Sequence, residues 1–442
     1  MINTKNRVFQ GRLITLPQSP ELPTVTSAKT TRPSLVIIGH GVAATKTVER
    51  LIRENPNAYY ITIVGDEPHH HYNRIMLSPL LAGDIELDGL FTAEPPSWYQ
   101  EHNIRVLQGH RAQAINPQTK QITLTNGETL NYDALILATG SRATVPNISH
   151  SDADNVIGFR TLNDVDRLLA LAANVTHAMV IGAGLLGIEA AAALAKQGKH
   201  TTLVHRQAHI MNRQLDATAA GMLQATLAER NVHCVLNHQI DELTTDNRGF
   251  VNAITLTDRQ TGQTQTLPVG LLVFAIGITP NIELAANAGI DCERAIIVDE
   301  YLRTSDPDIY ALGECVQFQQ QLFGLVEPVV DQANVLAKYL LEGKHSQPLV
   351  LRDMATKLKV SGIKVYSAGV VDAQAQQQTI VMHDPSQGVY KKMILDQGQL
   401  VGMVLMGDVS DGPWFYEQMQ SKQDLSEIAQ IVVFGAAFVE HN

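Results

Sequence analysis

The stretch SLVIIGHGVAATKTVERLIRENPNAYYITIVGD, residues 34–66, decides the fold. It contains an apolar run, a glycine-rich turn, a segment with apolar residues at helical spacing and a second apolar run. Val48, Leu51 and Ile52 give the middle segment its apolar side. Two strands joined by a helix form a parallel βαβ unit. The sequence therefore predicts an α/β architecture in which helices flank a parallel sheet.

The turn GHGVAA, residues 39–44, has the residue types that a dinucleotide-binding loop needs. Gly39 allows a tight turn, Gly41 lets a pyrophosphate approach the backbone, and Ala44 lets helix and strand pack closely. The helix N-terminus offers free N–H groups to phosphates. Asp66 ends the next strand, where a carboxylate can bind ribose hydroxyls. The residues predicted to bind here are Gly39, Gly41, Val42, Ala43 and Asp66.

The same pattern recurs in THAMVIGAGLLGIEAAAALAKQGKHTTLVHR, residues 176–206. A strand, a glycine turn, a helix and a strand follow one another again, and the turn GAGLLG has all three glycines. A complete unit that occurs twice is more specific than a lone glycine motif, so we predict two Rossmann-like dinucleotide-binding domains. The residues predicted to bind at the second loop are Gly182, Gly184, Leu185, Leu186 and Gly187.

The second unit ends in His205 and Arg206, at the place where a carboxylate would favour NADH. An arginine there can accept the 2′-phosphate of NADPH. Gly187 favours the opposite choice, because NADPH sites often have alanine in its place. His205 and Arg206 are therefore assigned to the nucleotide site, and the choice between NADH and NADPH stays open.

Length and composition exclude several classes of protein. The 442 residues predict two to four domains. A formal net charge of −11 argues against nucleic acid or an anionic membrane as a partner, and no apolar run is long enough to span a bilayer. Cys234, Cys292 and Cys315 form no clustered motif, which excludes a local redox dithiol or a cysteine-built zinc or iron–sulfur site. So few cysteines are typical of a cytoplasmic protein.

Other segments indicate the remaining organisation. Asn126-Gly127 separates two alternating segments and predicts a β-hairpin. The stretch VYKKMILDQGQLVGMVLMGD, residues 389–408, predicts two strands that turn at Gly398, followed by helical pieces. The last part of the chain is therefore predicted to be α+β. Residues 1–33 are rich in proline, threonine and serine and are predicted to be a flexible leader.

Three further segments carry a family resemblance: ALILATGS (134–141), LLVFAIGITPN (271–281) and TSDPDIYALGECVQF (304–318). Together with the two loops, they resemble the flavoproteins of the glutathione reductase fold, which have two dinucleotide-binding domains. The resemblance implies FAD at the first loop and NAD(P)H at the second. It divides the chain into an FAD-binding domain, 34–149 and 270–345, an inserted NAD(P)-binding domain, 150–269, and a C-terminal domain, 346–442.

A narrower resemblance rests on YNRIMLSPLLAG (72–83), FGLVEPVVDQA (323–333) and TKLKVSGIKVYSAG (356–369). These segments are similar to the flavin-containing half of NAD(P)H nitrite reductase, to the electron-transfer subunit of assimilatory nitrate reductase and, more broadly, to rubredoxin reductases. The resemblance implies that Glu314 binds FAD and that a helix beginning near Pro328 directs its N-terminus at the flavin. The other cofactor-binding residues that it implies are Asn73, Arg74, Ser78, Ala112, Ala138, Thr139, Gly140, Gly277 and Gly313.

One position departs from this pattern. Several relatives have a lysine after the serine of the flavin loop, where it can pair with a glutamate of the second helix. Here Pro79 follows Ser78, although the helix glutamate, Glu189, is present. Glu189 and Arg74 are predicted to be the catalytic residues, and whether Arg74 replaces the missing lysine stays open.

The cysteine positions narrow the function that this resemblance implies. No cysteine lies near the expected flavin loop, and the chain lacks the cysteine-rich segments of a complete nitrite reductase. We therefore expect hydride transfer from NAD(P)H to FAD, followed by electron transfer to a metalloprotein. The expected partner is a separate nitrate or nitrite reductase catalytic subunit, or a small iron–sulfur or rubredoxin-like carrier.

Other functions and the oligomeric state stay open. The alternatives are an NAD(P)H oxidase or diaphorase, a rubredoxin or ferredoxin reductase, and a non-enzymatic flavin-binding scaffold. A homodimer is one option for the assembly.

Three consecutive histidines, His69, His70 and His71, lie between Asp66 and the expected flavin loop. Imidazole is a common metal ligand. Adjacent side chains point in different directions, however, so three in a row rarely face one ion. We therefore predict a polar loop near the adenosine or pyrophosphate of the cofactor, and no metal site.

Overall fold

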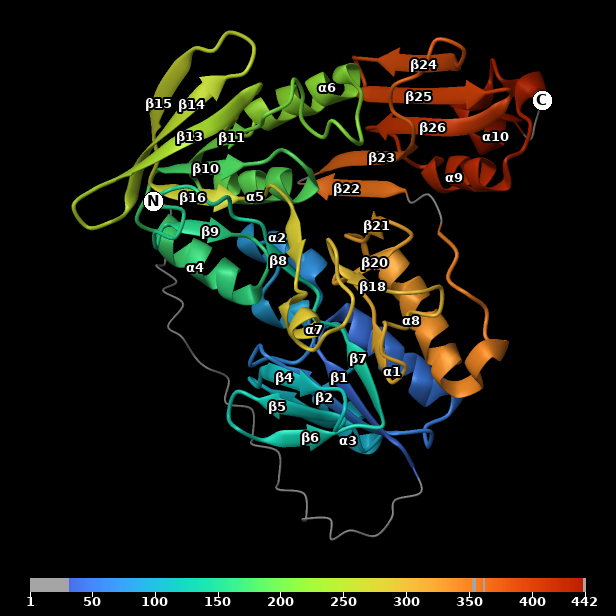
Figure 1. The fold of residues 1–442 in the computed structure, drawn as a ribbon. Coiled ribbons are helices and arrows are strands. Elements are labelled where there is room, and N and C mark those ends of the chain that lie inside the picture. The colour runs from blue at the N-terminus through green and yellow to red at the C-terminus, as the bar shows by residue number, and fades with distance from the viewer. Residues whose placement is uncertain (1–31, 352–354, 361, 440–442) are drawn as a thin grey trace.

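The computed structural model describes residues 32–351, 355–360 and 362–439 of the chain (Figure 1). Residues 1–31 lie outside this part, so the predicted flexible leader falls almost wholly outside the described residues. In the described ranges, no helix combines the length and apolar character that crossing a membrane requires.

The first parallel sheet has the strand order β19-β7-β1-β2-β3. Its outer strand β19 comes from a segment about 170 residues after β7 and pairs with it in parallel. Helices α1 (Val42–Glu54) and α8 (Val326–Glu342) pack against each other beside this sheet. The strands are β1 (Ser34–Ile38), β2 (Tyr60–Gly65), β3 (Arg105–Gln108), β7 (Ala134–Leu137) and β19 (Ile309–Ala311).

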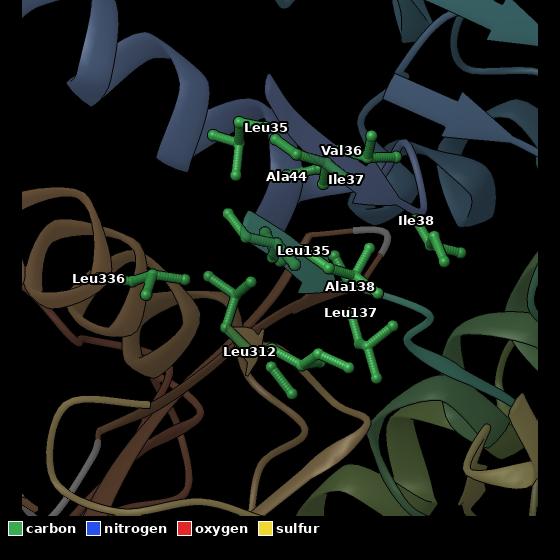
Figure 2. Packing of buried hydrophobic residues seen from close by; sticks show 14 of the residues in the cluster. Leu35, Val36, Ile37, Ile38, Ala44, Leu135, Leu137, Ala138, Leu312 and Leu336 are labelled. Atoms are coloured by element: carbon green, nitrogen blue, oxygen red, sulfur yellow. The ribbon is translucent and has the colours of Figure 1, made fainter. Parts of the chain in front are cut away.

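The core of this part is built from strand residues that are buried on both faces of the sheet. Leu35, Ile37 and Leu135 are fully buried, and Leu336 of α8 packs toward the same strands (Figure 2). Continuous apolar strands of this kind are expected where helices cover both faces. Leu312, just after β19, belongs to the same cluster, so the segment that contains β19 packs against the N-terminal strands.

The second parallel sheet has the order β12-β11-β10-β16-β9 and repeats the same design. Helix α5 is rich in alanine, and Ala190, Ala191 and Ala193 let it approach the strands closely. The elements are β9 (Val156–Gly158), α4 (Leu162–Ala172), β10 (His177–Ile181), α5 (Leu185–Lys196), β11 (His200–Val204), α6 (Ala217–Ala228), β12 (Val232–Val235) and β16 (Leu271–Phe274).

Smaller sheets complete these two parts, and their strands pair antiparallel except for one parallel pair, between residues 296–297 and 316–317. The predicted hairpin at Asn126-Gly127 is confirmed, because the strands on either side of it pair antiparallel. The strands of these sheets are β4 (Ala112–Asn116), β5 (Gln121–Leu124) and β6 (Thr129–Asn131); β8 (Ser141–Ala143) and β17 (Ile278–Pro280); β13 (His238–Thr245), β14 (Val251–Asp258) and β15 (Thr264–Pro268); and β18 (Ile296–Ile297), β20 (Val316–Phe318) and β21 (Gln321–Leu322).

Short helices fill the connections between these sheets. Helix α2 (Leu77–Leu81) follows the 3-10 turn η1 (Arg74–Met76) and packs on α4 and α5 of the second parallel sheet. The remaining ones are η2 (Leu87–Leu90), α3 (Pro96–Glu101), α7 (Glu283–Asn287) and η3 (Gly343–His345).

The C-terminal part is an antiparallel sheet in the order β22-β23-β26-β25-β24 with helices at one end (Figure 1). The predicted turn at Gly398 is confirmed: β25 and β26 pair on either side of it. Tyr390 and Val404 belong to the same buried cluster as residues of α5 and α6, so this sheet packs on the second parallel sheet's helices. The elements are β22 (Thr356–Val360), β23 (Ile363–Gly369), β24 (Gln378–Asp384), β25 (Val389–Asp396), β26 (Gln399–Met406), α9 (Gly412–Ser421), η4 (Ser426–Ile428), η5 (Val432–Phe434) and α10 (Ala436–Val439).

These elements confirm the predicted fold class, with two Rossmann-like units and an α+β C-terminal part. The exact residues at which one domain gives way to the next stay a prediction.

Candidate functional site

Both glycine loops leave the carboxyl ends of their strands through a left-handed glycine. Gly39 has a φ of +111° and Gly182 a φ of +105°. A Cβ atom at Gly39 would lie 2.1 Å from the carbonyl oxygen of Ala138, and one at Gly182 would lie 2.4 Å from that of Ala275. Both positions therefore require glycine for two reasons, the backbone conformation and the close approach of a neighbouring strand.

The second glycine of each loop borders open space. A Cβ atom at Gly41 or at Gly184 would meet no atom of the described chain within 4 Å. Each of these glycines caps a helix, α1 or α5, with no side-chain hydrogen bond from the described residues to the first-turn N–H groups. The free N–H groups and the positive end of each helix thus border a space that can hold a phosphate. A bound pyrophosphate needs this arrangement.

The two loops open onto one continuous cavity of about 1180 Å³. Single small-molecule sites have about 300–1,000 Å³, so this cavity exceeds a drug-sized site and suits two extended cofactors. The predicted residues that line it are Gly39, Gly41, Val42, Ala43, Asp66, Asn73, Arg74, Ala138, Thr139, Gly140, Gly182, Gly184, Leu185, Leu186, Glu189, His205, Arg206, Gly277, Gly313 and Glu314.

Three predicted residues in the described part of the chain are not on the cavity wall: Ser78, Ala112 and Gly187. A Cβ atom at Gly187 would lie 1.8 Å from the carbonyl oxygen of Gly182, so this glycine allows α5 to pack against its own loop. Ala112 lies in β4 and pairs with Leu124. Its role toward the adenine stays a prediction.

Ser78 contacts Glu189, which lines the cavity. Its hydroxyl donates a hydrogen bond of 2.7 Å to Oε2 of Glu189, which joins α2 to α5. Burial raises the pKa of Glu189, and the hydrogen bond from Ser78 offsets part of this increase. Glu189 therefore tends to hold a proton at a higher pH than an exposed glutamate does.

Arg74, the other predicted catalytic residue, has a different partner. Its guanidinium forms an ion pair with Glu67 and also donates a hydrogen bond of 3.2 Å to the carbonyl oxygen of Arg160. The hydroxyl of Tyr72 donates to the same carboxylate, at 2.7 Å. The structure thus pairs Arg74 with Glu67 and Glu189 with Ser78.

Glu314 accepts hydrogen bonds from two residues that sequence reasoning did not assign. Ser141 Oγ donates to Glu314 Oε2 at 2.6 Å, and the guanidinium of Arg160 forms an ion pair with the same oxygen. Burial lowers the pKa of Arg160 to about 10, with a further contribution from nearby Arg74. Arg160 lines the cavity. Arg160 is a single arginine after an apolar strand and belongs to no sequence motif. Only the tertiary structure therefore identifies it as part of the site.

The strand end of the second unit also brings unpredicted residues to the cavity. His205 Nδ1 accepts a hydrogen bond from the N–H of Ala183 at 3.2 Å, and its Nε2 lies 3.1 Å from Oδ1 of Asn212. Burial lowers the pKa of His205. Asn212 and Arg213 line the cavity beside Arg206. The segment IMNRQLD, residues 210–216, contains both of them, but its spacing alone assigns them no role.

The histidine loop lies along the first glycine loop. His69, His70 and His71 all line the cavity, together with His40 of the loop itself. His40 Nε2 is 3.2 Å from the hydroxyl of Tyr99, and its ring centroid lies 5.8 Å from that of His70. The Nδ1 atoms of His40 and His70 are buried without a partner among the described residues, so they are available to a polar ligand.

Burial lowers the pKa of His40, His70 and His71. It brings the pKa of His40 to about 3, with further contributions from His70 and His71, and that of His71 to about 4. Among the described residues, no group of three histidine, cysteine or acidic side chains is placed to hold a metal ion.

All three cysteines are described, and none lines the cavity. Cys315 is fully buried, its sulfur lies 3.2 Å from the carbonyl oxygen of Leu312, and burial raises its pKa. A buried thiol with a raised pKa is unreactive. The cavity therefore has two loops suited to dinucleotides and several charged hydrogen-bonding groups. No thiol of this chain lines it.

Comparison with known proteins agrees with this geometry. The family model for "pyridine nucleotide-disulphide oxidoreductase" matches residues 33–335, and the one for "rubredoxin NAD+ reductase C-terminal domain" matches residues 355–423. The first match contains both glycine loops, and the second contains all five strands of the C-terminal sheet.

Two curated relatives are from Bacillus subtilis (strain 168). A nitrite reductase [NAD(P)H] is 37% identical over 90% of this chain and 48% of its own length. An assimilatory nitrate reductase electron transfer subunit is 36% identical over 89% of this chain and 50% of its own length. The chain thus spans about half the length of these relatives. The covalent putidaredoxin reductase–putidaredoxin complex is a similar solved structure, with a TM-score of 0.75, 26% identity and coverage of 89% of this chain and 93% of that one.

Proposed function

The chain belongs to the pyridine nucleotide-disulphide oxidoreductase family, and we propose that it is an FAD-containing, NAD(P)H-dependent reductase that delivers electrons to a metalloprotein partner. The observation that carries this proposal is the pair of glycine loops that open onto one cavity. Hydride transfer between two cofactors is fast when a protein holds both in contact and in the right orientation. One cavity shared by two dinucleotide loops can hold them so.

The first loop would hold FAD, and the residues around it fit a dinucleotide. The N-terminus of α1 faces open space at Gly41, Asp66 lies where ribose hydroxyls would be bound, and the orphaned Nδ1 atoms of His40 and His70 can bond to a polar group. We assign Asn73, Ala138, Thr139, Gly140 and Gly313 to the same site. When bound, FAD accepts two electrons as a hydride and can release them singly.

Glu314 and the N-terminal turn of α8 would complete the flavin side. Ser141 and Arg160 hold the Glu314 carboxylate in one orientation, so it can accept a further hydrogen bond without reorganising. Leu325 and Val326 at the start of α8 line the cavity. The positive end of this helix would stabilise negative charge that develops on a reduced flavin.

The second loop would hold NAD(P)H, with Gly182, Gly184, Leu185 and Leu186 around the pyrophosphate. Glu189, one turn further along α5, lies on the wall shared by the two sites and is held by Ser78. We propose that the Glu189 carboxyl group carries a proton over part of the working pH range, on the oxygen that does not accept the Ser78 hydrogen bond, and orients the nicotinamide. Arg74 forms an ion pair with Glu67 and would place a positive charge on the part of this cavity wall that is nearest to the flavin.

Electrons would leave to a metal centre because the cavity contains no thiol of this chain that could serve as acceptor. The names of the relatives suggest a nitrate or nitrite reductase catalytic subunit of nitrate assimilation, and a small iron–sulfur or rubredoxin-like carrier is the other metalloprotein option. We further propose a cytoplasmic location, where sparse, unpaired cysteines are expected.

The experiment has two stages. The purified protein should contain bound flavin, and anaerobic mixing with NADH or NADPH should bleach it within the time of a stopped-flow trace. The reduced protein is then mixed with the candidate nitrate reductase subunit or with a rubredoxin. Reoxidation by either partner supports the proposal; fast turnover with oxygen and none with partners would instead make the protein an oxidase.

A further inference from the structure

A loop beside the second nucleotide site forms part of the cavity wall. Residues 211–214 of this loop line the cavity. Met211 donates its N–H to the carbonyl oxygen of Ala183, at 2.8 Å, and Ala183 is the second residue of the glycine loop GAGLLG. Asn212 contacts His205, whose other ring nitrogen accepts a hydrogen bond from the N–H of Ala183. The position of this loop therefore decides which side chains meet a nucleotide at the glycine loop.

The backbone of this loop needs support from its surroundings. Met211 has a φ of +48°, in the left-handed region that residues with a side chain rarely adopt. Such a conformation persists only where the neighbouring structure holds it. Met211 is 1% exposed and belongs to the same buried cluster as Leu215 and as Tyr390 of the C-terminal sheet. The C-terminal sheet is thus one of the structures that surround the loop.

Asp216 ends the loop, and its two carboxylate oxygens have different partners. Oδ1 accepts a hydrogen bond of 3.0 Å from the N–H of Ala219 and so caps α6. Oδ2 accepts hydrogen bonds from the hydroxyl of Tyr390 at 2.6 Å and from the ammonium group of Lys392 at 2.8 Å. The exposed fractions of Asp216, Tyr390 and Lys392 are 6%, 3% and 8%. Water and salt therefore screen this contact little, and one carboxylate joins the loop, α6 and the C-terminal sheet.

The segment YKK, residues 390–392 of β25, presents its two lysines to two different sets of carboxylates. Successive side chains of a strand point to opposite faces of the sheet. Tyr390 and Lys392 therefore share one face, and both reach the carboxylate that caps α6, which lies next to this sheet (Figure 1). Lys391 points the other way and pairs with Asp408. Strand β25 lies between β24 and β26, so pairing on both sides fixes the backbone that carries these groups.

From these contacts we infer that Asp216, Tyr390 and Lys392 are positioning residues for the nicotinamide nucleotide. Through them the C-terminal sheet holds residues 211–214 in place beside Ala183, so that the nucleotide meets a wall that is already ordered. The three side chains lie outside the cavity wall, so they act through the loop and not by touching the nucleotide. The inference rests on the proposed function and adds the C-terminal sheet to its second nucleotide site.

Asp216→Asn separates positioning from helix capping. Asparagine caps a helix as well as aspartate does, so α6 keeps its cap, while the hydrogen bond from Lys392 loses its negatively charged acceptor. The flavin-loaded protein is titrated calorimetrically with NAD+ and with NADP+, neither of which reduces the flavin. We expect Asp216→Asn to weaken binding of the nucleotide that the wild type binds by about fivefold or more.

Stopped-flow reduction of the flavin provides a second measurement. In Asp216→Asn the nucleotide concentration that gives the half-maximal rate should rise by about the same factor. The maximal rate should stay within about twofold of the wild-type value, because the substitution affects binding and changes no residue on the cavity wall. The flavin content of the purified variant should be unchanged, since the first glycine loop is not altered.

A double variant tests whether the effect is one of position or only of stability. Asp216→Asn and Lys392→Met each leave one buried charge without its partner. Asp216→Asn/Lys392→Met contains neither charge, so its midpoint of urea unfolding should return close to the wild-type value. Its nucleotide affinity should stay as low as that of Lys392→Met, because the contact from the ammonium group to the loop is still absent. Recovery of affinity together with stability would overturn the inference.

Tyr390→Phe and Lys391→Met complete the set of variants. Tyr390→Phe keeps the buried ring and removes only the hydroxyl that donates to Asp216, so it is the variant that disturbs folding least. It should weaken nucleotide binding by about twofold or more. Lys391→Met is the matched control, because it removes a buried lysine from the same strand but from the pair with Asp408. It should leave nucleotide affinity unchanged.

The outcomes separate this inference from the proposed function. Wild-type affinity for both nucleotides in the variants of Asp216, Tyr390 and Lys392, with flavin reduction intact, overturns the positioning role and leaves the reductase proposal standing. An equal loss of affinity in Lys391→Met would make the effect one of general stability and would also overturn the positioning role. If the wild-type protein binds neither nucleotide, and neither NADH nor NADPH reduces its flavin, the proposed function itself fails.

Discussion

Ser78 Oγ lies 2.7 Å from Glu189 Oε2, and this contact joins a helix beside the predicted flavin loop to the first helix of the second nucleotide unit. The partner of this buried carboxyl group is thus a neutral hydroxyl, and Pro79 occupies the next position in the chain. A hydroxyl lowers the pKa of a buried carboxyl group less than a full positive charge does. The raised pKa of Glu189 is the physical consequence.

The first prediction concerns the pH dependence that this pair imposes. The rate of flavin reduction by NADPH, measured by stopped flow between pH 5 and 8, should contain a step due to Glu189. Ser78→Ala removes a hydrogen bond that lowers the pKa of Glu189, so the step should move to higher pH. Glu189→Gln should remove the step. A profile identical in the wild type and both variants would contradict a protonic role for this pair.

The second prediction concerns the buried ion pair between the C-terminal sheet and α6. Lys392 Nζ lies 2.8 Å from Asp216 Oδ2, and Asp216 also caps α6 through the N–H of Ala219. Lys392→Met leaves a buried carboxylate without its counter-ion, which typically destabilises a protein by about 3–5 kcal/mol. We expect a loss of that order in the free energy of unfolding, measured by urea denaturation of the flavin-loaded protein.

Lys391→Met is the control for that experiment. Lys391 is also buried and is adjacent in sequence, but it pairs with Asp408 and Asp411 inside the C-terminal part. Both variants should lose stability, whereas only Lys392→Met should weaken nucleotide binding, because Asp216 ends the loop that carries Asn212 and Arg213. Equal nucleotide affinity in the two variants would show that the C-terminal sheet does not position this loop.

The third prediction is a pH dependence of stability from the buried histidines. The folded pKa values of His40 and His71 lie below the ordinary value, at about 3 and about 4. Their contribution to stability is therefore fully present above about pH 6.5 and is lost as the pH falls toward 4. Between pH 7.5 and 5 each histidine should account for a loss of about 2 kcal/mol in flavin-free protein.

Urea unfolding of the flavin-free protein at the two pH values measures this loss. His71→Gln should reduce it, while substitution of the exposed His233 should not. The same loss in wild type and His71→Gln would mean that the imidazole titrates normally in the folded state. Bound FAD should diminish the effect of pH, because a phosphate nearby favours the protonated imidazole.

The fourth prediction separates the two nucleotide sites. Gly39→Ala places a Cβ against the backbone of Ala138, and Gly182→Ala places one against that of Ala275. The first variant should lose bound flavin, which a loss of the visible absorbance of the flavin in the purified protein would reveal. The second should keep its flavin and lose NADPH-dependent reduction of it.

Gly249→Ala is the matched control for both. Gly249 also has a positive φ, +82°, but a Cβ there would meet no described atom within 4 Å. Gly249→Ala should lower the free energy of unfolding by only about 1–2 kcal/mol, the cost of a left-handed alanine. It should cause no loss of either cofactor. Loss of flavin in the Gly182 variant would indicate that the two loops do not act as separate sites.

Sequence and structure agree best where the interactions are local. The two strand–turn–helix–strand units, the hairpin at Asn126-Gly127 and the turn at Gly398 are encoded within short windows, because glycine and asparagine turns and apolar periodicity act over a few residues. The residues of the two loops could be assigned for the same reason. No local pattern predicts the pairing of β19 with β7.

By itself, the sequence therefore determined the two dinucleotide loops, their flanking elements and the fold class, since each rests on backbone conformations that its own residues specify. Only the tertiary structure decided which charged groups meet. Ser78 reaches Glu189 across 111 residues, Arg160 reaches Glu314 across 154, and Lys392 reaches Asp216 across 176. Such contacts depend on how helices and sheets pack, and no spacing in the chain encodes them.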